Sequence, residues 1–345
     1  MLTRIWARNI ACFGDNDYGI DLSPETVIVG PNNVGKSALI AGFNFLRNTR
    51  FGSLQFDTSS YGWDSFETII YRHERGRVMK LGAEIKGQEW SGLLELEWTP
   101  GQQLIWHVVP EGPHDRIQRE LSNIWYLLAS RSDVPRQTQV GSQGLTTSWR
   151  QPLNPDGSNV VTFLLERYTS RDPRWSIAED WLKKIVPEFS ILKSPLRGAQ
   201  GSVETEHTRL GVDINLAYQG TGTQKALSTI AALVFSPEGS TVIVEEPEIH
   251  LHPRSQEVLI DLFNLAVTKW GKQVIFTTHS WDMLLPLISD IGDGSERGKT
   301  HVKADPKEFK LVTFARDGDQ VKIEDYDLKN KDFMKVRAYF KQLWG

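Results

Sequence analysis

The amino-acid sequence predicts an α/β fold with a mixed β-sheet core, on three observations. Short apolar runs at positions 27–29, 241–244 and 274–278 stop abruptly at glycine or polar residues, as strands buried on both faces do. Helical patterns follow the first two of these runs. Residues 51–112 instead alternate polar and apolar side chains, which is typical of antiparallel strands.

Composition limits the classes of protein to which the chain can belong. Its 345 residues are 39% hydrophobic and 24% charged, enough for one large core or two joined lobes. The single cysteine, Cys12, rules out an internal disulfide, and we interpret it as a core residue. No signal peptide and no run of about 20 apolar residues is evident, so we expect a cytoplasmic protein without a membrane partner. The net charge of -4 neither requires nor excludes nucleic acid.

A glycine-rich loop with the spacing G-x-x-x-x-G-K-S runs from Gly30 to Ser37, between a strand and a helical pattern. Its glycines let backbone N–H groups converge on phosphate oxygens at the positive end of the helix dipole. Lys36 supplies a charge to the β and γ phosphates, and the Ser37 hydroxyl can ligate Mg²⁺. The loop therefore predicts ATP and Mg²⁺ as ligands. The predicted nucleotide-binding residues are Gly30, Pro31, Asn32, Asn33, Val34, Gly35, Lys36, Ser37 and Ala38.

Two adjacent carboxylates, Glu245 and Glu246, follow the apolar run at 241–244. Ligands of parallel sheets bind beyond the carboxyl ends of the strands. Successive strand residues point in opposite directions, so the two carboxylates can have different roles. We expect Glu245 to face Mg²⁺ and Glu246 to act as the base for the attacking water.

A third apolar run, 274–278, ends at His279, which can sense a phosphate by a hydrogen bond. We therefore predict His279 and Lys36 as catalytic residues together with Glu246. His250 and His252 lie nearby but lack the ligand set of a metal site, and Pro253 is placed to open a helix.

The order of these segments resembles that of the ABC-type ATPases of the RecF/SMC branch. The phosphate loop comes first, followed by "YQGTGTQKALSTIAALVFS", "VIVEEPE" and "FTTHS". The segment "EEPEIHLHP" is similar to that of the OLD (overcoming lysogenization defect) ATPases. The resemblance implies an ABC-type P-loop ATPase with an N-terminal antiparallel β-ribbon and a helical lobe that bears the signature. Residues 113–206 are too short and too often broken for a coiled coil.

The resemblance also implies a signature loop that caps the γ-phosphate held by a second copy of the chain. Thr221, Gly222, Thr223 and Gln224 occupy the matching positions, with Thr223 in place of the second glycine. Glu245 likewise stands where ABC proteins usually have Asp. The implied assembly is a homo-oligomer, either an ATP-sandwich dimer or a higher state. The resemblance implies a Q-loop glutamine too, but several glutamines compete for that position and none is assigned.

Four segments follow from these patterns. We expect an N-terminal ATPase lobe with the phosphate loop and an antiparallel sheet, a helical insertion lobe, a C-terminal ATPase lobe with the signature and the two glutamates, and a terminal hairpin and helix. Their bounds are 1–112, 113–206, 207–290 and 291–345.

The tail beyond Trp281 is shorter than the TOPRIM domain that OLD nucleases append, so we expect any nuclease to be a separate chain. Asp317 and Asp319 are interpreted as residues of a hairpin turn. Two basic clusters are interpreted as solvated surface, with nucleic-acid binding left open. They are Arg72, Arg75, Arg77 and Lys80 in a turn, and Lys329, Lys331, Lys335, Arg337 and Lys341 on a terminal helix.

The resemblance implies an ATP-hydrolysing enzyme that dimerises around ATP and acts as a sensor or switch for a separate effector, such as a nuclease or toxin. Bacterial anti-phage defence or DNA maintenance is the expected setting. Two alternatives stay open at this point: an ATP-binding scaffold with negligible turnover that stores its partner, and a DNA-repair ATPase of RecF type that binds duplex DNA.

Overall fold

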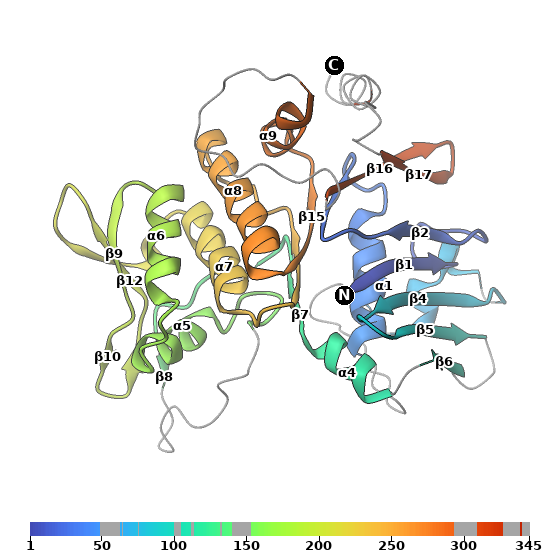
Figure 1. The fold of residues 1–345 in the computed structure, drawn as a ribbon, viewed down its shortest axis with the longest axis horizontal. Coiled ribbons are helices and arrows are strands. Elements are labelled where there is room, and N and C mark those ends of the chain that lie inside the picture. Colours follow the sequence, from blue (N-terminus) through green and yellow to red (C-terminus); the bar gives the residue numbers. More distant parts are fainter. Residues whose placement is uncertain are drawn as a thin grey trace.

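The computed structural model describes residues 1–48, 63, 65–74, 76–99, 105–111, 114–131, 133–139, 153–292, 309–326 and 339. Its two larger sheets share one apolar core. A smaller strand region lies at the far left of the molecule (Figure 1). Most strands of both larger sheets follow the residue patterns that predicted them; the exception is residues 124–127, a strand within the segment that was expected to be a helical lobe.

The central sheet has six strands in the order β17-β16-β3-β15-β14-β7. The strands from β16 to β7 run parallel, and only β17 is antiparallel, so the sheet is mixed. The carboxyl ends of β3, β15 and β14 therefore meet at one edge. The strands are β3 (Glu25–Val29), β7 (Ile124–Leu127), β14 (Thr241–Glu245), β15 (Gln273–Thr278), β16 (Phe309–Asp317) and β17 (Gln320–Tyr326).

Both faces of this sheet are buried, because successive residues of each strand enter different cores. Val27 and Val29 belong to one core and Ile28 to the other. Val244 and Ile243 divide in the same way along β14. This two-sided burial explains why the strands read as continuous apolar runs.

The second sheet has five antiparallel strands in the order β2-β1-β4-β5-β6. It packs with α1 (Lys36–Asn48) on one face of the central sheet, where Leu39, Phe43 and Leu46 of the helix are buried. The expected N-terminal β-ribbon is the pair β1 and β2. The strands are β1 (Leu2–Arg8), β2 (Tyr18–Asp21), β4 (Met79–Lys86), β5 (Ser91–Trp98) and β6 (Ile105–Glu111).

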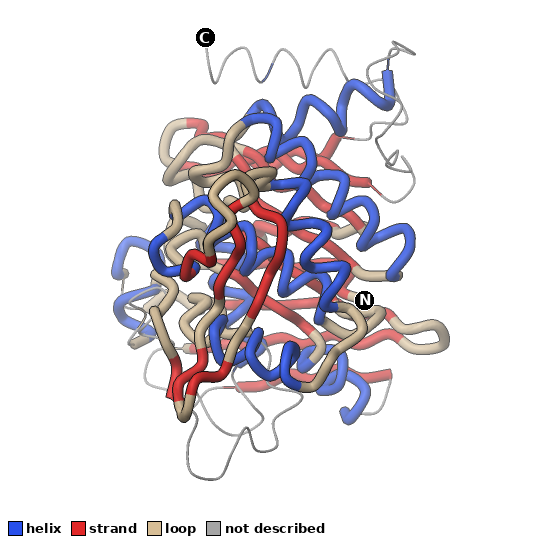
Figure 2. The backbone as a smooth tube through the Cα atoms, turned by 90° about the vertical axis from the view of Figure 1, so that its left-hand side faces the viewer, coloured by secondary structure: helices blue, strands red, loops and turns tan. Residues whose placement is uncertain are grey.

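Helices cover the opposite face of the central sheet, in front of its strands in the side view (Figure 2). They are α5 (Val160–Thr169), α6 (Trp175–Ile185), α7 (Thr221–Phe235) and α8 (Pro253–Trp270). Helix α8 begins at Pro253, as predicted, and His252 caps it by accepting a hydrogen bond from Arg254 N at 3.3 Å. Among the described residues, no helix is both long and apolar enough to cross a bilayer.

Residues 113–206 are less helical than the pattern predicted. Helix α4 (His114–Ser122) leads into β7, which pairs with β14 in the central sheet. Two three-stranded sheets accompany α5 and α6. Their strands are β8 (Thr138–Gln139), β9 (Phe189–Lys193), β10 (Leu196–Arg197), β11 (Gln200–Gly201), β12 (Glu204–His207) and β13 (Asp213–Asn215). The remaining elements are α3 (Phe66–Ile69), η1 (Tyr71–His73), η2 (Leu216–Tyr218) and α9 (Trp281–Gly292).

Asp317 ends β16, and Asp319 lies in the turn to β17 next to Gly318, whose φ is 59°. The predicted hairpin is therefore present. Among the described residues of the first basic cluster, Arg72 pairs with Asp319 at 2.6 Å. Arg77 and Lys80 also pair with carboxylates, so these charges are largely neutralised. Arg75 and the basic residues of the expected terminal helix lie outside the described residues.

Candidate active site

The glycine-rich loop connects β3 to α1 at the carboxyl edge of the central sheet. A Cβ at Gly30 would lie 2.4 Å from Phe314 O of β16, so the loop can leave the sheet there only as glycine. Gly35 has a φ of 111°, and a Cβ there would lie 2.5 Å from Cys12 Sγ. Both glycines therefore meet backbone or space requirements that other residues do not.

Lys36 is buried at the first turn of α1. Its Nζ donates hydrogen bonds to Gly30 O at 2.7 Å and Pro31 O at 2.8 Å. Burial lowers the pKa of Lys36, while Glu246 and other nearby carboxylates favour its charged form. The two carbonyl oxygens occupy the donors that phosphate oxygens would take, so the loop fits a bound polyphosphate.

Ser37 and Glu245 come together although they are 208 positions apart in the chain. Ser37 Oγ donates to Glu245 Oε2 at 3.0 Å, and Tyr126 of β7 donates a short hydrogen bond to the other carboxylate oxygen. A hydroxyl and a carboxylate are the hard oxygen donors that Mg²⁺ prefers. Their contact beside the phosphate loop fits a Mg²⁺ ion shared with phosphates.

Glu246 leaves the strand in a left-handed conformation, with a φ of 42°. Its N–H is held by Thr277 O at 3.0 Å on β15, and its Oε1 lies 3.6 Å from His279 Nδ1. The neighbouring imidazole lowers the pKa of Glu246, and the carboxylate raises the pKa of His279. A strained residue held in place by its surroundings is typical of a functional position.

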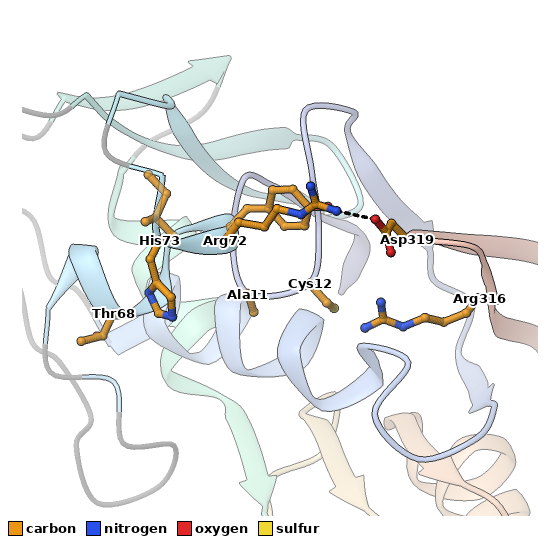
Figure 3. Close-up of a pocket in the computed structure, with 9 residues that line it drawn as sticks. Ala11, Cys12, Thr68, Arg72, His73, Arg316 and Asp319 are labelled. Carbon is orange, nitrogen blue, oxygen red and sulfur yellow. Dashed lines mark hydrogen bonds and ion pairs between the residues drawn. The ribbon is translucent and has the colours of Figure 1, made fainter.

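The phosphate loop borders a cavity of about 540 Å³. Its lining consists of Ala11, Cys12, Asn32, Asn33, Gly35, Lys36, Ser37, Ala38 and Glu246. A second cavity of about 420 Å³ shares Ala11 and Cys12 with the first. Figure 3 shows this second cavity, where Arg72 and Arg316 approach from opposite sides and Asp319 pairs with Arg72.

Cys12 is half-buried and lines both cavities, so its interpretation as a simple core residue is wrong. The sequence signal was missed because the segment after β1 does not continue as a strand. Asn9 and Ala11 both have φ of 50°, which turns the chain toward the phosphate loop.

The signature segment lies at the start of α7 and not at the chain's own phosphate loop. Thr221 is exposed and Thr223 is half-buried. A Cβ at Gly222 would lie 2.3 Å from His250 O, so this glycine permits close packing against the turn after Glu246. Gln224 is buried and engaged within the chain, since it accepts from Val134 N at 3.1 Å and donates to Gln219 O at 3.0 Å.

Three residues near the two glutamates were not predicted as site residues. Tyr126 and Arg131 come from β7 and the segment after it, far from any recognised motif. Glu248 is buried, and its Oε1 accepts hydrogen bonds from Thr278 Oγ1 at 2.5 Å and His279 N at 3.1 Å. The segment that forms β7 was expected to be helical, and only the tertiary structure shows that it is a strand next to β14. No cluster of three or more His, Cys, Asp or Glu side chains suited to a metal occurs in the described part of the chain.

This geometry can be compared with known proteins. A family model described as "AAA domain, putative AbiEii toxin, Type IV TA system" matches residues 151–285. The OLD nuclease of Thermus scotoductus is 21% identical over 363 aligned residues, covering 94% of this chain and 66% of that protein. The energy-coupling factor transporter ATP-binding protein EcfA2 of Mycoplasma capricolum is 23% identical over 142 residues, or 36% of this chain and 47% of that protein.

Solved structures agree on the fold. The SmcHead bound to the C-winged helix domain of ScpA has a TM-score of 0.62 at 13% identity, covering 97% of this chain and 99% of that one. The chain has the fold of the SMC head domains and is similar to the OLD nuclease over most of its length. The SMC head domain from Thermotoga maritima, with a TM-score of 0.53, 12% identity and coverage of 94% and 98%, has the same fold. The predicted fold class is confirmed.

The chain spans 66% of the length of the Thermus OLD nuclease and less than half of EcfA2. The likeness therefore concerns the ATPase fold, and the activities of those whole proteins do not transfer with it.

Proposed function

We propose that the protein binds and hydrolyses ATP at the cavity beside the phosphate loop. The contact between Ser37 Oγ and Glu245 Oε2 carries this proposal, because it joins the helix after the phosphate loop to the end of β14. An ATP-binding type of protein is also consistent with the AAA and EcfA2 likenesses.

Each residue then has a distinct role. Lys36 and the loop amides hold the phosphates, and Lys36 exchanges its carbonyl partners for phosphate oxygens. Ser37 and Glu245 would hold Mg²⁺, which supplies neutralising charge to the phosphates when bound. Glu246 accepts a proton from or orients the attacking water, and His279 keeps the Glu246 carboxylate ionised and in place.

The second cavity is placed to receive the rest of the nucleotide. It continues from the first through Ala11 and Cys12, and it presents Tyr71, His73 and Arg316 to an entering ring or ribose. Aromatic and guanidinium faces stack on nucleobases, so this chemistry suits a nucleoside.

We infer further that ATP joins two copies of the chain head to tail. No signature residue lines the cavity of its own chain, and Thr221 at the start of α7 is exposed. A partner copy would then supply Thr221 and Gly222 to the phosphates. ATP-dependent association of this kind could act as a switch for a separate effector, such as a nuclease or toxin, in anti-phage defence.

ATP binding and turnover of purified protein test the proposal. Lys36→Ala should abolish ATP binding measured by calorimetry, because the buried cation that meets the phosphates is removed. Glu246→Gln should keep binding but lower kcat by at least ~100-fold, the typical contribution of a general base.

Glu188→Gln, an exposed carboxylate beside β9, serves as the control and should match the parent. Turnover in Glu246→Gln equal to that of the parent would refute the assigned base. Tight ATP binding without turnover in the parent would instead support the alternative of an ATP-binding scaffold that stores its partner. The hydrogen bonds of Gln224 within its own chain would also suit that alternative.

A further inference from the structure

Arg131 is a buried cation with no hydrogen-bond partner within the described residues. Its exposed fraction is 7%, and Nε, Nη1 and Nη2 are all inaccessible to water and without an acceptor. Leaving such donors unpaired is costly, so a native protein retains them only where they serve a purpose.

Arg131 follows β7, whose last residue, Leu127, is paired with Val244 next to Glu245 at the end of β14. Glu245 and Glu248 are the two charges that favour the ionised form of Arg131 against burial. Glu248 also has a buried oxygen, Oε2, with no partner among the described residues. The segment after β7 thus holds unpaired donors on Arg131, and the turn after β14 holds an unpaired acceptor on Glu248.

The segment that carries Arg131 is attached to the signature helix. Lys225 Nζ of α7 donates to Ala129 O at 3.2 Å, and Val134 N donates to Gln224 Oε1 at 3.1 Å. A shift of the start of α7 would therefore carry Arg131 relative to the glutamates.

We propose that Arg131 is a positioning residue for the ATP site, the buried counter-cation that balances Glu245 and Glu248 and pairs with Glu248 Oε2 when the signature helix moves. This inference rests on the proposed ATP site. Arg131, in the segment after β7, thus connects the signature segment to the metal-side carboxylate. The role is positional, because the guanidinium is buried away from the cavity lining.

The test separates charge from packing. In Arg131→Gln, loss of a cation beside Glu245 should lower the Mg²⁺ concentration for half-maximal turnover roughly threefold to tenfold, while kcat falls about tenfold or more. A purely structural defect would weaken Mg²⁺ and ATP together. Arg131→Lys keeps the charge and should keep the Mg²⁺ requirement of the parent.

Binding without metal gives a second readout. In EDTA, calorimetry should show that Arg131→Gln binds ATP several-fold more weakly, because the anion loses a nearby positive charge. Arg167→Gln is the matched control, since Arg167 is a similarly buried arginine on α5 that is paired with Glu166. The control should bind ATP as the parent does.

Glu248→Gln removes a negative charge from the same site and should therefore raise the Mg²⁺ concentration for half-maximal turnover. This variant also tests the inference if Arg131→Gln does not fold. The inference is overturned if Arg131→Gln matches the parent in both readouts, if Arg131→Lys alters the Mg²⁺ requirement, or if Glu248→Gln lowers it. A parent that does not bind ATP at all would refute the proposed function instead.

Discussion

Glu246 and Glu248 lie on the same short segment, yet their surroundings shift their pKa values in opposite directions. Glu246 faces the cavity, and the His279 imidazole lowers its pKa. Glu248 is enclosed, and burial raises its pKa despite the donors from Thr278 and His279. The surroundings of Glu246 therefore favour its ionised form, as a general base requires, whereas the ionised form of Glu248 would need a nearby cation to balance its burial.

The Glu246 and His279 pair predicts a defined pH dependence. The pKa of Glu246 is lowered from 4.5, so its contribution to stability is present above that value and is lost as the pH falls through the lowered pKa. The pKa of His279 is raised from 6.5, so its contribution is complete below that value and is lost as the pH rises through the raised pKa. The pair should stabilise the fold fully between pH 4.5 and 6.5.

An NMR titration of His279 measures this effect. We expect its midpoint above 6.5 in the parent and a fall toward 6.5 in Glu246→Gln. In Glu188→Gln, the same titration should be that of the parent. A His279 midpoint that is unchanged in Glu246→Gln would show that the two side chains do not interact.

At the scale of elements, the first turn of α7 has no room for a side chain at Gly222. Gly220 and Gly222 flank Thr221, but a Cβ at Gly220 would meet no atom within 4 Å. A Cβ at Gly222 would instead overlap His250 O. The first turn of the signature helix is thus packed on the turn that follows Glu246. We expect a shift of one turn to displace the other.

Gly222→Ala should therefore destabilise the protein by about 1–3 kcal/mol, the usual effect of inserting a methyl group into a packed site. Chemical denaturation measures the change, and the midpoint should fall with an unchanged m-value. Gly220→Ala is the matched control in the same turn and should differ from the parent by no more than ~1 kcal/mol. Equal denaturation midpoints for the two variants would show that the packing at Gly222 accommodates a methyl group without loss of stability.

At the scale of the whole molecule, the phosphate loop and the signature segment of one chain do not share a cavity. The first lies between β3 and α1 beside the five-stranded sheet, whereas α7 belongs to the helical face of the central sheet (Figure 1). If the signature residues complete the phosphate site, as we propose, a second copy of the chain must supply them.

Thr221→Arg should block ATP-driven association, because a long cation at this exposed position would enter the partner's phosphate site. In a Glu246→Gln background, light scattering after size exclusion should show ATP-dependent dimers that Thr221→Arg abolishes. Thr208→Arg, an equally exposed threonine near β12, should leave dimers intact. Normal dimers in the Thr221→Arg protein would argue against a shared site.

The basic turn around Arg72 was a candidate site for nucleic acid. Arg72, Arg77 and Lys80 are each paired with a carboxylate, so these described residues of the turn do not form a free basic surface. This arrangement favours the interpretation of the turn as solvated surface over a phosphate track.

Sequence by itself determined the elements whose signals are local. Gly30 to Ser37 predicted the strand, loop and helix around the phosphates, because glycine spacing and the apolar stripe of α1 arise within adjacent residues. The apolar run before Glu245 predicted β14, and Pro253 predicted the start of α8. Resemblance in the order of motifs predicted the fold class.

Only the tertiary structure decided which distant side chains meet. Tyr126 contacts Glu245, and the electrostatic influence of Glu245 and Glu248 extends to Arg131, because β7 pairs with β14, a contact between residues more than a hundred positions apart. Cys12 lines the cavity because the chain turns sharply after β1. Strand pairing and chain reversal depend on long-range packing, and neither periodicity nor spacing in a single sequence records it.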